Sequence, residues 1–206
     1  MADDEFTATR VSLHAVAELL LAGPQHATSG KIALRALPGG FGTSLAPDVR
    51  VSGTDLLAGD RSVSIHGRTA HELGEELGIP PIGLGEVYSD GSGIGVEQRL
   101  RVDATAAERI ARAYAVGDQA LRAIAATPIL WPEHFDIGIT LDTERVNLGV
   151  SPGDALLGTP YMYVGPWEPP PADAFWNQPF GAARELADDV DDVVAFFDEG
   201  RSRLGR

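Results

Sequence analysis

The chain has 206 residues, a formal net charge of −14 and a pI near 4.6. An acidic surface repels phosphate backbones and anionic lipid headgroups, so the charge argues against nucleic acid and membranes as partners. The sequence contains no cysteine, which excludes disulfides, Fe–S clusters and thiolate-bound metals. A divalent metal, if one binds, would be held by His, Asp and Glu.

The N-terminus carries no sign of export or membrane insertion. Its first residues, MADDEF, are acidic where a secretory signal is basic, and the apolar run VAELLLAG is too short to span a bilayer. We therefore expect a cytoplasmic protein. The abundance of Ala, Gly, Val and Asp, with Lys31 as the only lysine, is typical of a GC-rich bacterial genome.

The N-terminal part is predicted to begin with a helix, followed by strands. A helix over 9–21, with Thr7 or Thr9 as its N-cap, should end at the Gly23–Pro24 dipeptide. Alternating apolar residues then predict three short antiparallel strands, at 32–37, 49–51 and 63–65.

A second helix and a long connection follow. Thr69 and Glu72 form a capping box at the start of a helix that should end at Gly78. Residues 80–97 are rich in Gly and Pro, have no sustained period and are predicted to form the connection between two halves. Within them, SDGSGIG lacks the lysine of a phosphate-binding loop and is predicted to be a turn.

The C-terminal part repeats the order helix, strands, helix. A capping box of Thr105 with Glu108 should begin a helix that reaches Thr127–Pro128. A hairpin within 130–154, a strand in PYMYVGPW, a Pro-rich loop and an acidic C-terminal helix complete the chain. Because the strands connect through short turns, the fold class is α+β, with antiparallel strands and flanking helices. We predict one compact domain, 1–206, of two packed halves, 7–79 and 103–204.

The hairpin is the candidate site. With a turn at 142–145, one face carries only aliphatic side chains, and the other pairs Thr140 with Asn147, Gly138 with Gly149, and Asp136 with Ser151. Two facing glycines in a strand pair indicate that something flat lies over the sheet. The protein's own aromatics, Trp167 or Trp176, are one candidate cover, and a ligand is the other.

His134 and Asp136 are the candidate chemical groups. Two residues apart on a strand, they would point to the same side, about 6.6 Å apart along the chain. That spacing suits two metal ligands or a carboxylate-oriented general base, but also a buried histidine that a backbone carbonyl satisfies. Ser151 lies in VSPGD, which is not a nucleophile elbow, so it could act only if His134 reaches it.

A resemblance to known proteins lies in five stretches: PGGFGT, LWPEHFD, NLGVSPGD, PYMYVGPW and FWNQPFGAA. In these stretches the sequence resembles a family of bacterial proteins of about 200 residues and unknown function. The similarity covers nearly the whole chain. This resemblance implies no activity. The sequence resembles none of the well-known hydrolase, kinase, dehydrogenase or transcription-factor families.

Three functional hypotheses follow. The first is a small-molecule binding protein with an aromatic-walled pocket on the polar face of the hairpin; its ligand-binding residues would be Trp131, Glu133, Gly138, Asn147, Gly149, Tyr161, Tyr163, Trp167 and Trp176. The second is a metal-assisted or His/Asp-dependent hydrolase with His134, Asp136 and Ser151 as catalytic residues, supported by Glu133 or Asp154, and with His134 and Asp136 as metal ligands. The third is a structural module that forms a homo-oligomer through the Trp/Pro-rich segment 161–180.

Overall fold

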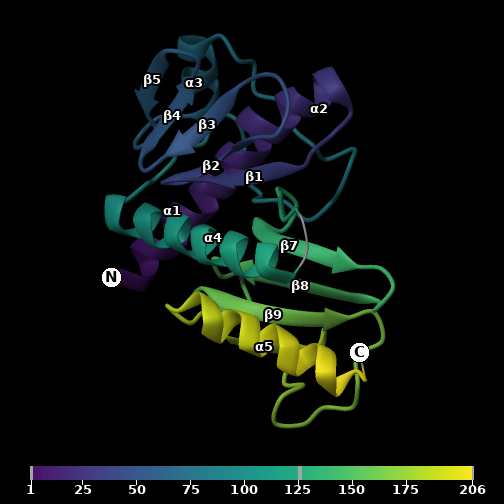
Figure 1. The fold of residues 1–206 in the computed structure, drawn as a ribbon. Helices are drawn as coiled ribbons and strands as arrows, with labels where there is room; N and C mark the ends of the chain where they lie inside the picture. Colours follow the sequence, from purple (N-terminus) through teal and green to yellow (C-terminus); the bar gives the residue numbers. More distant parts are fainter. Residues whose placement is uncertain (1, 125–126, 206) are drawn as a thin grey trace. The chain divides into compact units, whose positions relative to one another are not determined.

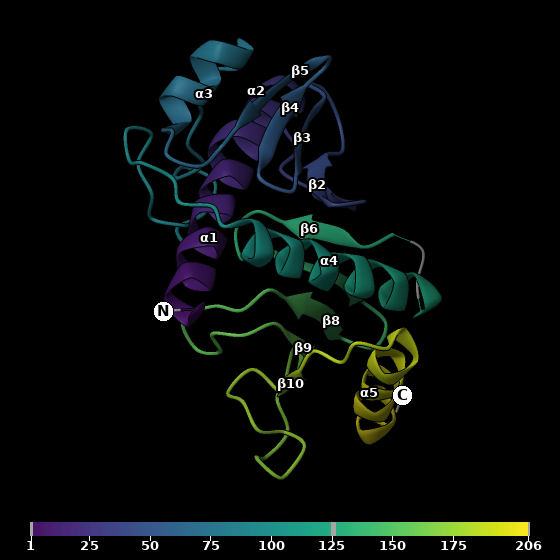
Figure 2. The same cartoon turned by 90° about the vertical axis from the view of Figure 1, so that its left-hand side faces the viewer.

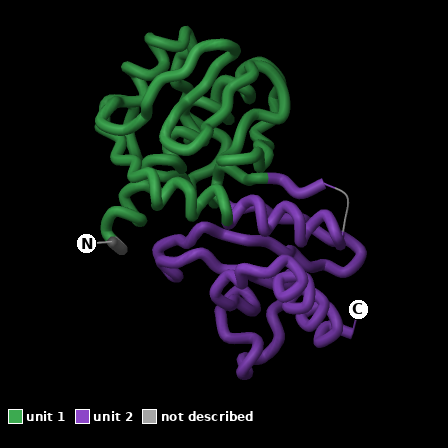
Figure 3. Tube along the Cα trace, turned by 60° about the vertical axis from the view of Figure 1, so that its left-hand side comes forward, with its two compact units in different colours: residues 1–112, 130–135 green, residues 113–129, 136–206 purple. Residues whose placement is uncertain are grey.

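The computed structural model describes residues 2–124 and 127–205. The chain divides into two compact units: unit 1 comprises residues 1–112 and 130–135, and unit 2 comprises residues 113–129 and 136–206 (Figure 3). The Gly/Pro-rich connection 80–97 belongs entirely to unit 1. The boundary between the units therefore falls inside a helix and not in that connection.

Unit 1 opens with an uninterrupted helical run, which corrects the predicted stop at Gly23–Pro24. The run consists of α1 (Ala2–Val16), the π-helical segment η1 (Ala17–Ala22) and α2 (Gly23–Ser29). Pro24 is tolerated because it lies in the first turn of α2, where the hydrogen-bond pattern changes and a missing N–H costs little. The run ends at Gly30, whose φ of 69° is the left-handed conformation of a helix C-cap.

Gly23 is required for a different reason, the close approach of another backbone segment. A Cβ atom at this position would overlap the carbonyl group of Ile82. The Ile82 N–H also donates to the Leu19 carbonyl at 2.9 Å, so the connection 80–97 lies directly against η1.

The strands of unit 1 are antiparallel and more numerous than predicted. Five strands precede the next helix where three were expected, because the glycines of GFGT and the short DLLA run hide two of them. The strand order is β6-β1-β2-β3-β4-β5, with Leu130 of β6 paired to Leu34 of β1. Their bounds are β1 (Leu34–Leu37), β2 (Gly40–Thr43), β3 (Val49–Ser52), β4 (Asp55–Ala58), β5 (Arg61–Ser64) and β6 (Ile129–Trp131).

One of the two predicted capping boxes is confirmed. Helix α3 (Ala70–Leu77) begins at Thr69, whose hydroxyl accepts from the Glu72 N–H while the Glu72 carboxylate accepts from the Thr69 N–H. Helix α4 (Ala104–Ile124) begins earlier than predicted, because the Asp103 carboxylate accepts the Ala106 N–H at 2.9 Å. Residues 125–126, over which α4 was predicted to continue, lie outside the described residues.

Unit 2 contains the predicted hairpin in its predicted register. β7 (Asp136–Leu141) and β8 (Val146–Ser151) flank the turn 142–145 and pair Leu141 with Val146, Ile139 with Leu148, and Ile137 with Val150. Gly138 faces Gly149 and Thr140 faces Asn147, also as predicted. β9 (Tyr161–Pro166) follows as expected, and β10 (Ala182–Glu185) extends the order to β10-β9-β8-β7.

Helices cover the aliphatic face of these strands. Gly117 of α4 lies against Ile137 and Val150, and Gly200 of α5 (Val190–Arg203) lies against Val164 of β9. Figures 1 and 2 show α5 running beside β9. The α+β class, with antiparallel strands and flanking helices, is thereby confirmed. No helix among residues 2–124 and 127–205 combines the length and hydropathy needed to cross a bilayer.

Candidate functional site

The glycine pair of the hairpin is covered by the protein's own Tyr163. A Cβ atom on Gly149 would overlap the Tyr163 ring and hydroxyl, and one on Gly138 would lie 3.0 Å from the same hydroxyl. An internal aromatic was one of the two expected covers, but the residue is Tyr163 and not Trp167 or Trp176. The bare backbone is therefore filled from within unit 2.

Asp136 binds this tyrosine. The Tyr163 hydroxyl donates to Asp136 Oδ2 at 2.5 Å, and Asp136 is only 7% exposed. Burial and the neighbouring carboxylate raise the pKa of Tyr163 well above its ordinary value, so the phenol stays protonated and remains the donor. The hydrogen bond between Tyr163 and Asp136 thus holds the Tyr163 ring on the polar face of the hairpin.

Two polar side chains, Ser151 and Asp154, form hydrogen bonds at the C-terminal end of β8. Ser151 is 2% exposed, and its Oγ accepts the Gly153 N–H at 3.1 Å. Asp154 accepts the Tyr161 hydroxyl at 2.6 Å and the Leu156 and Leu157 N–H groups at 2.7 and 2.8 Å. Burial and Asp154 raise the pKa of Tyr161. Ser151 thus terminates a strand, and its hydroxyl is not presented as a nucleophile.

His134 does not have the strand geometry that the predicted pair requires. It lies in the turn 132–135, Phe135 has a φ of 53°, and β7 begins only at Asp136. The His134 side chain is 59% exposed, and its Nε2 lies 3.8 Å from the Glu133 carboxylate. His134 belongs to unit 1 and Asp136 to unit 2. Within the part of the chain that the structure describes, no group of three or more His, Asp and Glu side chains could hold a metal ion.

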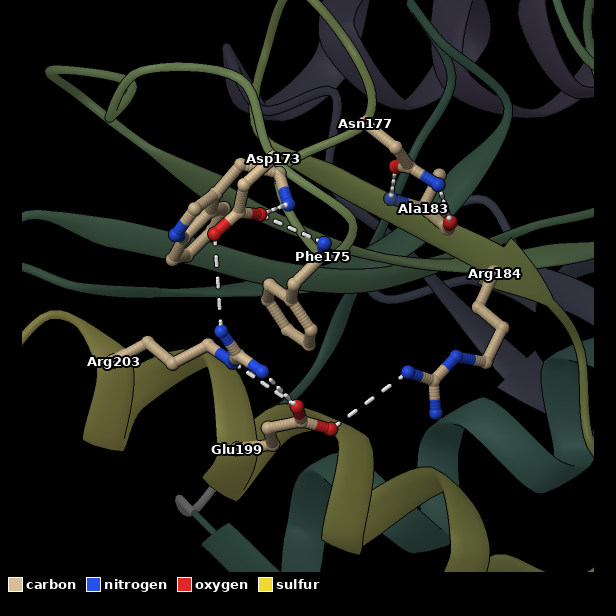
Figure 4. A network of polar contacts seen from close by, with 8 residues as sticks. Asp173, Phe175, Asn177, Ala183, Arg184, Glu199 and Arg203 are labelled. Carbon is tan, nitrogen blue, oxygen red and sulfur yellow. Dashed lines mark hydrogen bonds and ion pairs between the residues drawn. The ribbon is translucent and has the colours of Figure 1, made fainter.

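The Pro-rich segment is fixed by polar contacts of its own (Figure 4). Asp173 accepts the N–H groups of Phe175 and Trp176, both at 2.7 Å, and Asn177 exchanges two hydrogen bonds with the Ala183 backbone. From α5, Arg203 pairs with Glu199 and approaches Asp173. Trp176 is 5% exposed and packs edge-on against Phe175, so it is a core residue of this segment.

The other predicted ligand-binding residues are scattered. Trp167 is 49% exposed, with the Arg145 guanidinium over its ring. Asn147 accepts the Thr140 hydroxyl at 2.9 Å. Trp131 is a partly buried residue of β6 in unit 1. The nine residues predicted to form one aromatic-walled pocket therefore belong to several separate environments.

Unit 1 contains a buried carboxylate that the sequence did not single out. Glu18, at the start of η1, is 8% exposed and accepts the Tyr88 hydroxyl at 3.1 Å and the Ser92 N–H at 2.8 Å. Gly91 lies so close that a Cβ there would overlap the carboxylate. The glycine-rich stretch 89–95 therefore contacts a carboxyl group, and that group is the protein's own Glu18.

His14 lies next to this carboxylate on α1 and is partly buried. Its Nε2 lies 2.6 Å from the Pro132 carbonyl oxygen and 3.9 Å from Glu18, and its ring stacks on Phe135. Burial lowers the pKa of His14, against the opposing effect of Glu18. A neutral imidazole with Nε2–H donating to Pro132 fits these contacts, so the cluster serves as an internal connection between three segments of unit 1.

The open space in unit 1 lies elsewhere. A cleft of about 380 Å³ is bounded by the first turns of α1, the β3–β4 turn at Thr54, the end of β5 and the segment before α4. Its wall combines apolar surface with polar side chains of both charge signs. The polar residues besides Thr54 are Glu5, Thr9, Ser64, His66, Arg101 and Asp103.

Two buried hydroxyls hold one wall of the cleft in place. Thr9 and Ser12, 1% and 4% exposed, lie one turn apart on α1 and accept the N–H groups of Asp103 and Arg101, each at 2.9 Å. Thr9 is thus a buried helix-interior residue and not the predicted N-cap. The extended segment 101–103 is fixed by α1, so the wall exists before any ligand arrives.

Three groups of the cleft retain binding capacity. The Nδ1 atom of His66 lies 2.9 Å from the Val102 carbonyl oxygen and 3.2 Å from the Val102 backbone nitrogen. The Nε2 atom of His66 is therefore available for a ligand. Throughout residues 2–124 and 127–205, the side chains of Glu5 and Arg101 form no ion pair or hydrogen bond. Sequence reasoning missed this site because its residues come from four separated segments, and only the pairing of polar Thr9 and Ser12 on a buried helix face could have signalled it.

Comparison of the chain with protein-family models, with curated proteins and with solved structures found no match. The resemblance to a bacterial family of unknown function stays a prediction.

Proposed function

We propose that this protein binds a small polar molecule in the cleft of unit 1. The observation that carries the proposal is the cleft itself, about 380 Å³ in volume, with uncommitted polar groups on a preformed wall. Ligand sites are typically concave, largely preformed and equipped with a few fixed polar groups. The proposal keeps the predicted class of function but moves its site from the hairpin to unit 1.

The hairpin supports this relocation, because its groups are already engaged. Tyr163 fills the glycine pair, Asp136 binds Tyr163, and Trp176 is buried against Phe175. The hydrolase built on His134 and Asp136, and the oligomer formed through 161–180, stay hypotheses that no contact described above favours.

The test is to fill the cleft without changing its chemistry. Ala8 lines the cleft on α1 and is partly buried, so Ala8→Trp should occupy the space where a ligand would lie. Ala27→Trp, at an exposed position of α2, is the matched control. Ligand-observed NMR with a library of small polar fragments should give hits that bind the native protein and Ala27→Trp but not Ala8→Trp.

The opposite result is equally definite. If no fragment in the library shows binding that depends on Ala8, the cleft is a surface depression and the proposal is wrong. Thermal unfolding of both variants establishes that each is folded before its binding is compared.

A further inference from the structure

We infer that the ligand of this cleft is a small zwitterion, whose carboxylate meets Arg101 and whose ammonium group meets Glu5 and Asp103. The inference rests on the proposed function, since it specifies the ligand class of the same site. It follows from how charge is distributed around the cleft.

Among the described residues, Arg101 is one of several arginines that pair with no carboxylate, as Arg35, Arg50, Arg61 and Arg109 also do, and it is the one of these that lines the cleft. Arg68, Arg122, Arg145, Arg184, Arg201 and Arg203 each pair with a carboxylate. Arg101 pairs with none among the described residues, although it shares the cleft with two acidic side chains. Its backbone is fixed by Ser12, so the guanidinium is presented from an anchored position. A guanidinium fork matches the geometry of a carboxylate with two parallel hydrogen bonds.

The two carboxylates of the cleft, Glu5 and Asp103, also have oxygen atoms that a ligand could contact. Glu5 forms no ion pair with Arg101, since no N–O distance between them falls within 4.0 Å. Asp103 uses Oδ1 to cap the Ala106 N–H and keeps its second carboxylate oxygen. An ammonium group, with three donors, suits two carboxylates that cannot neutralise each other.

A ligand of one charge sign would meet repulsion in this cleft. A simple anion would be attracted to Arg101 but would face Glu5 and Asp103, and a simple cation would face Arg101. A molecule with both charges satisfies the cation and the carboxylates together, and the side chains of Ser64 and His66 line the same cleft as further polar groups. The cleft volume, near the lower end of ligand sites, fits a molecule of amino-acid size.

The experiment compares probes that differ only in charge. Binding of γ-aminobutyrate, butyrate, n-butylamine and n-butanol to the full chain is measured by NMR titration at low salt, together with the ω-amino acids from glycine to ε-aminocaproate. At least one zwitterion should bind about tenfold more tightly than the singly charged compound of matching length, because it gains a second charge-assisted contact.

Matched variants assign each charge. Arg101→Met should remove the preference for the zwitterion over the amine, and Glu5→Gln should weaken its preference over the carboxylate. Arg61→Met and Asp4→Asn are the controls, because both are exposed charged residues outside the cleft, in β5 and α1. Both controls should leave the order of affinities unchanged.

The outcomes separate the two proposals. If butanol, butyrate or butylamine binds as tightly as every zwitterion, and Ala8→Trp abolishes that binding, the ligand class is wrong and the binding function stands. If a zwitterion binds Ala8→Trp as well as the native chain, it binds outside the cleft and the inference fails. If no probe and no polar fragment binds in an Ala8-dependent way, both proposals fail.

Discussion

At Gly149, the space available to a side chain decides which residue fits. The Tyr163 ring occupies the volume where a Cβ would lie, and Asp136 holds that ring in place through its hydroxyl. The glycine therefore costs β-propensity but permits a buried tyrosine–carboxylate pair. A Cβ at position 149 would push the Tyr163 ring away, and any such shift would also lengthen its hydrogen bond to Asp136.

We predict that Gly149→Ala lowers the free energy of unfolding by about 1–3 kcal/mol, the usual cost of overpacking. Gly165→Ala is the matched control: it lies on the neighbouring strand β9, and its Cβ would meet other atoms only at 3.8 Å or more. It should change stability by no more than about 0.5 kcal/mol. Urea unfolding of both variants measures the difference, and equal midpoints would show that Tyr163 moves aside freely.

At the scale of elements, the connection 80–97 behaves as an ordered part of unit 1. Glu18 accepts hydrogen bonds from Tyr88 and Ser92, and Ile82 is bonded to Leu19. A long segment with few regular elements is thus fixed at three points to one π-helical turn. π-helical segments of this kind frequently coincide with sites where a side chain has a specific task.

We expect Glu18→Ala to release residues 88–92, because the partly buried Ser92 N–H loses its acceptor, and a donor left without a partner costs at most about 1–3 kcal/mol. Hydrogen exchange of the Ser92 amide should accelerate markedly. Tyr88→Phe removes only the hydroxyl contact and should have a smaller effect at Ser92. Glu86→Ala, an exposed glutamate in the same connection, is the control, and an identical exchange rate in Glu18→Ala would contradict this account.

The elements also show which features could be predicted from the sequence. The register of the hairpin could be predicted because alternating burial and a four-residue turn permit a single alignment of the two strands. The Thr69 capping box could be predicted because Thr69 and Glu72 are three residues apart, as this motif requires. Thr105 looked like a cap, but Asp103 supplies the contact. The residues that line the cleft could not be brought together from the sequence, since Glu5, Ser64 and Arg101 meet only through contacts between distant segments.

At the scale of the whole molecule, the chain passes between the two units three times. It crosses after residues 112, 129 and 135, so neither unit is a continuous stretch of sequence. The predicted halves, 7–79 and 103–204, therefore do not coincide with the compact units. Unit 1 takes its sixth strand, β6, from beyond α4.

We predict that separating the chain within the Gly/Pro-rich connection yields no stable unit 1. A fragment of residues 1–97 lacks the β1 partner in β6 and the segment 101–103 that Thr9 and Ser12 bind. Its urea transition should be lost or shifted to much lower concentration relative to the full chain. Co-expression with residues 98–206 is the control, and a fragment 1–97 that unfolds cooperatively at the native midpoint would show that β6 is dispensable.

The late arrival of β6 also matters while the protein is being made. When the first 112 residues have left the ribosome, β1 still has one edge without its partner, because Leu130 has not yet emerged to pair with Leu34. Exposed edges of this kind invite pairing between nascent chains. The N-terminal strands therefore keep one unpaired edge for as long as the synthesis of α4 and β6 lasts, and slower translation of that stretch lengthens this exposure.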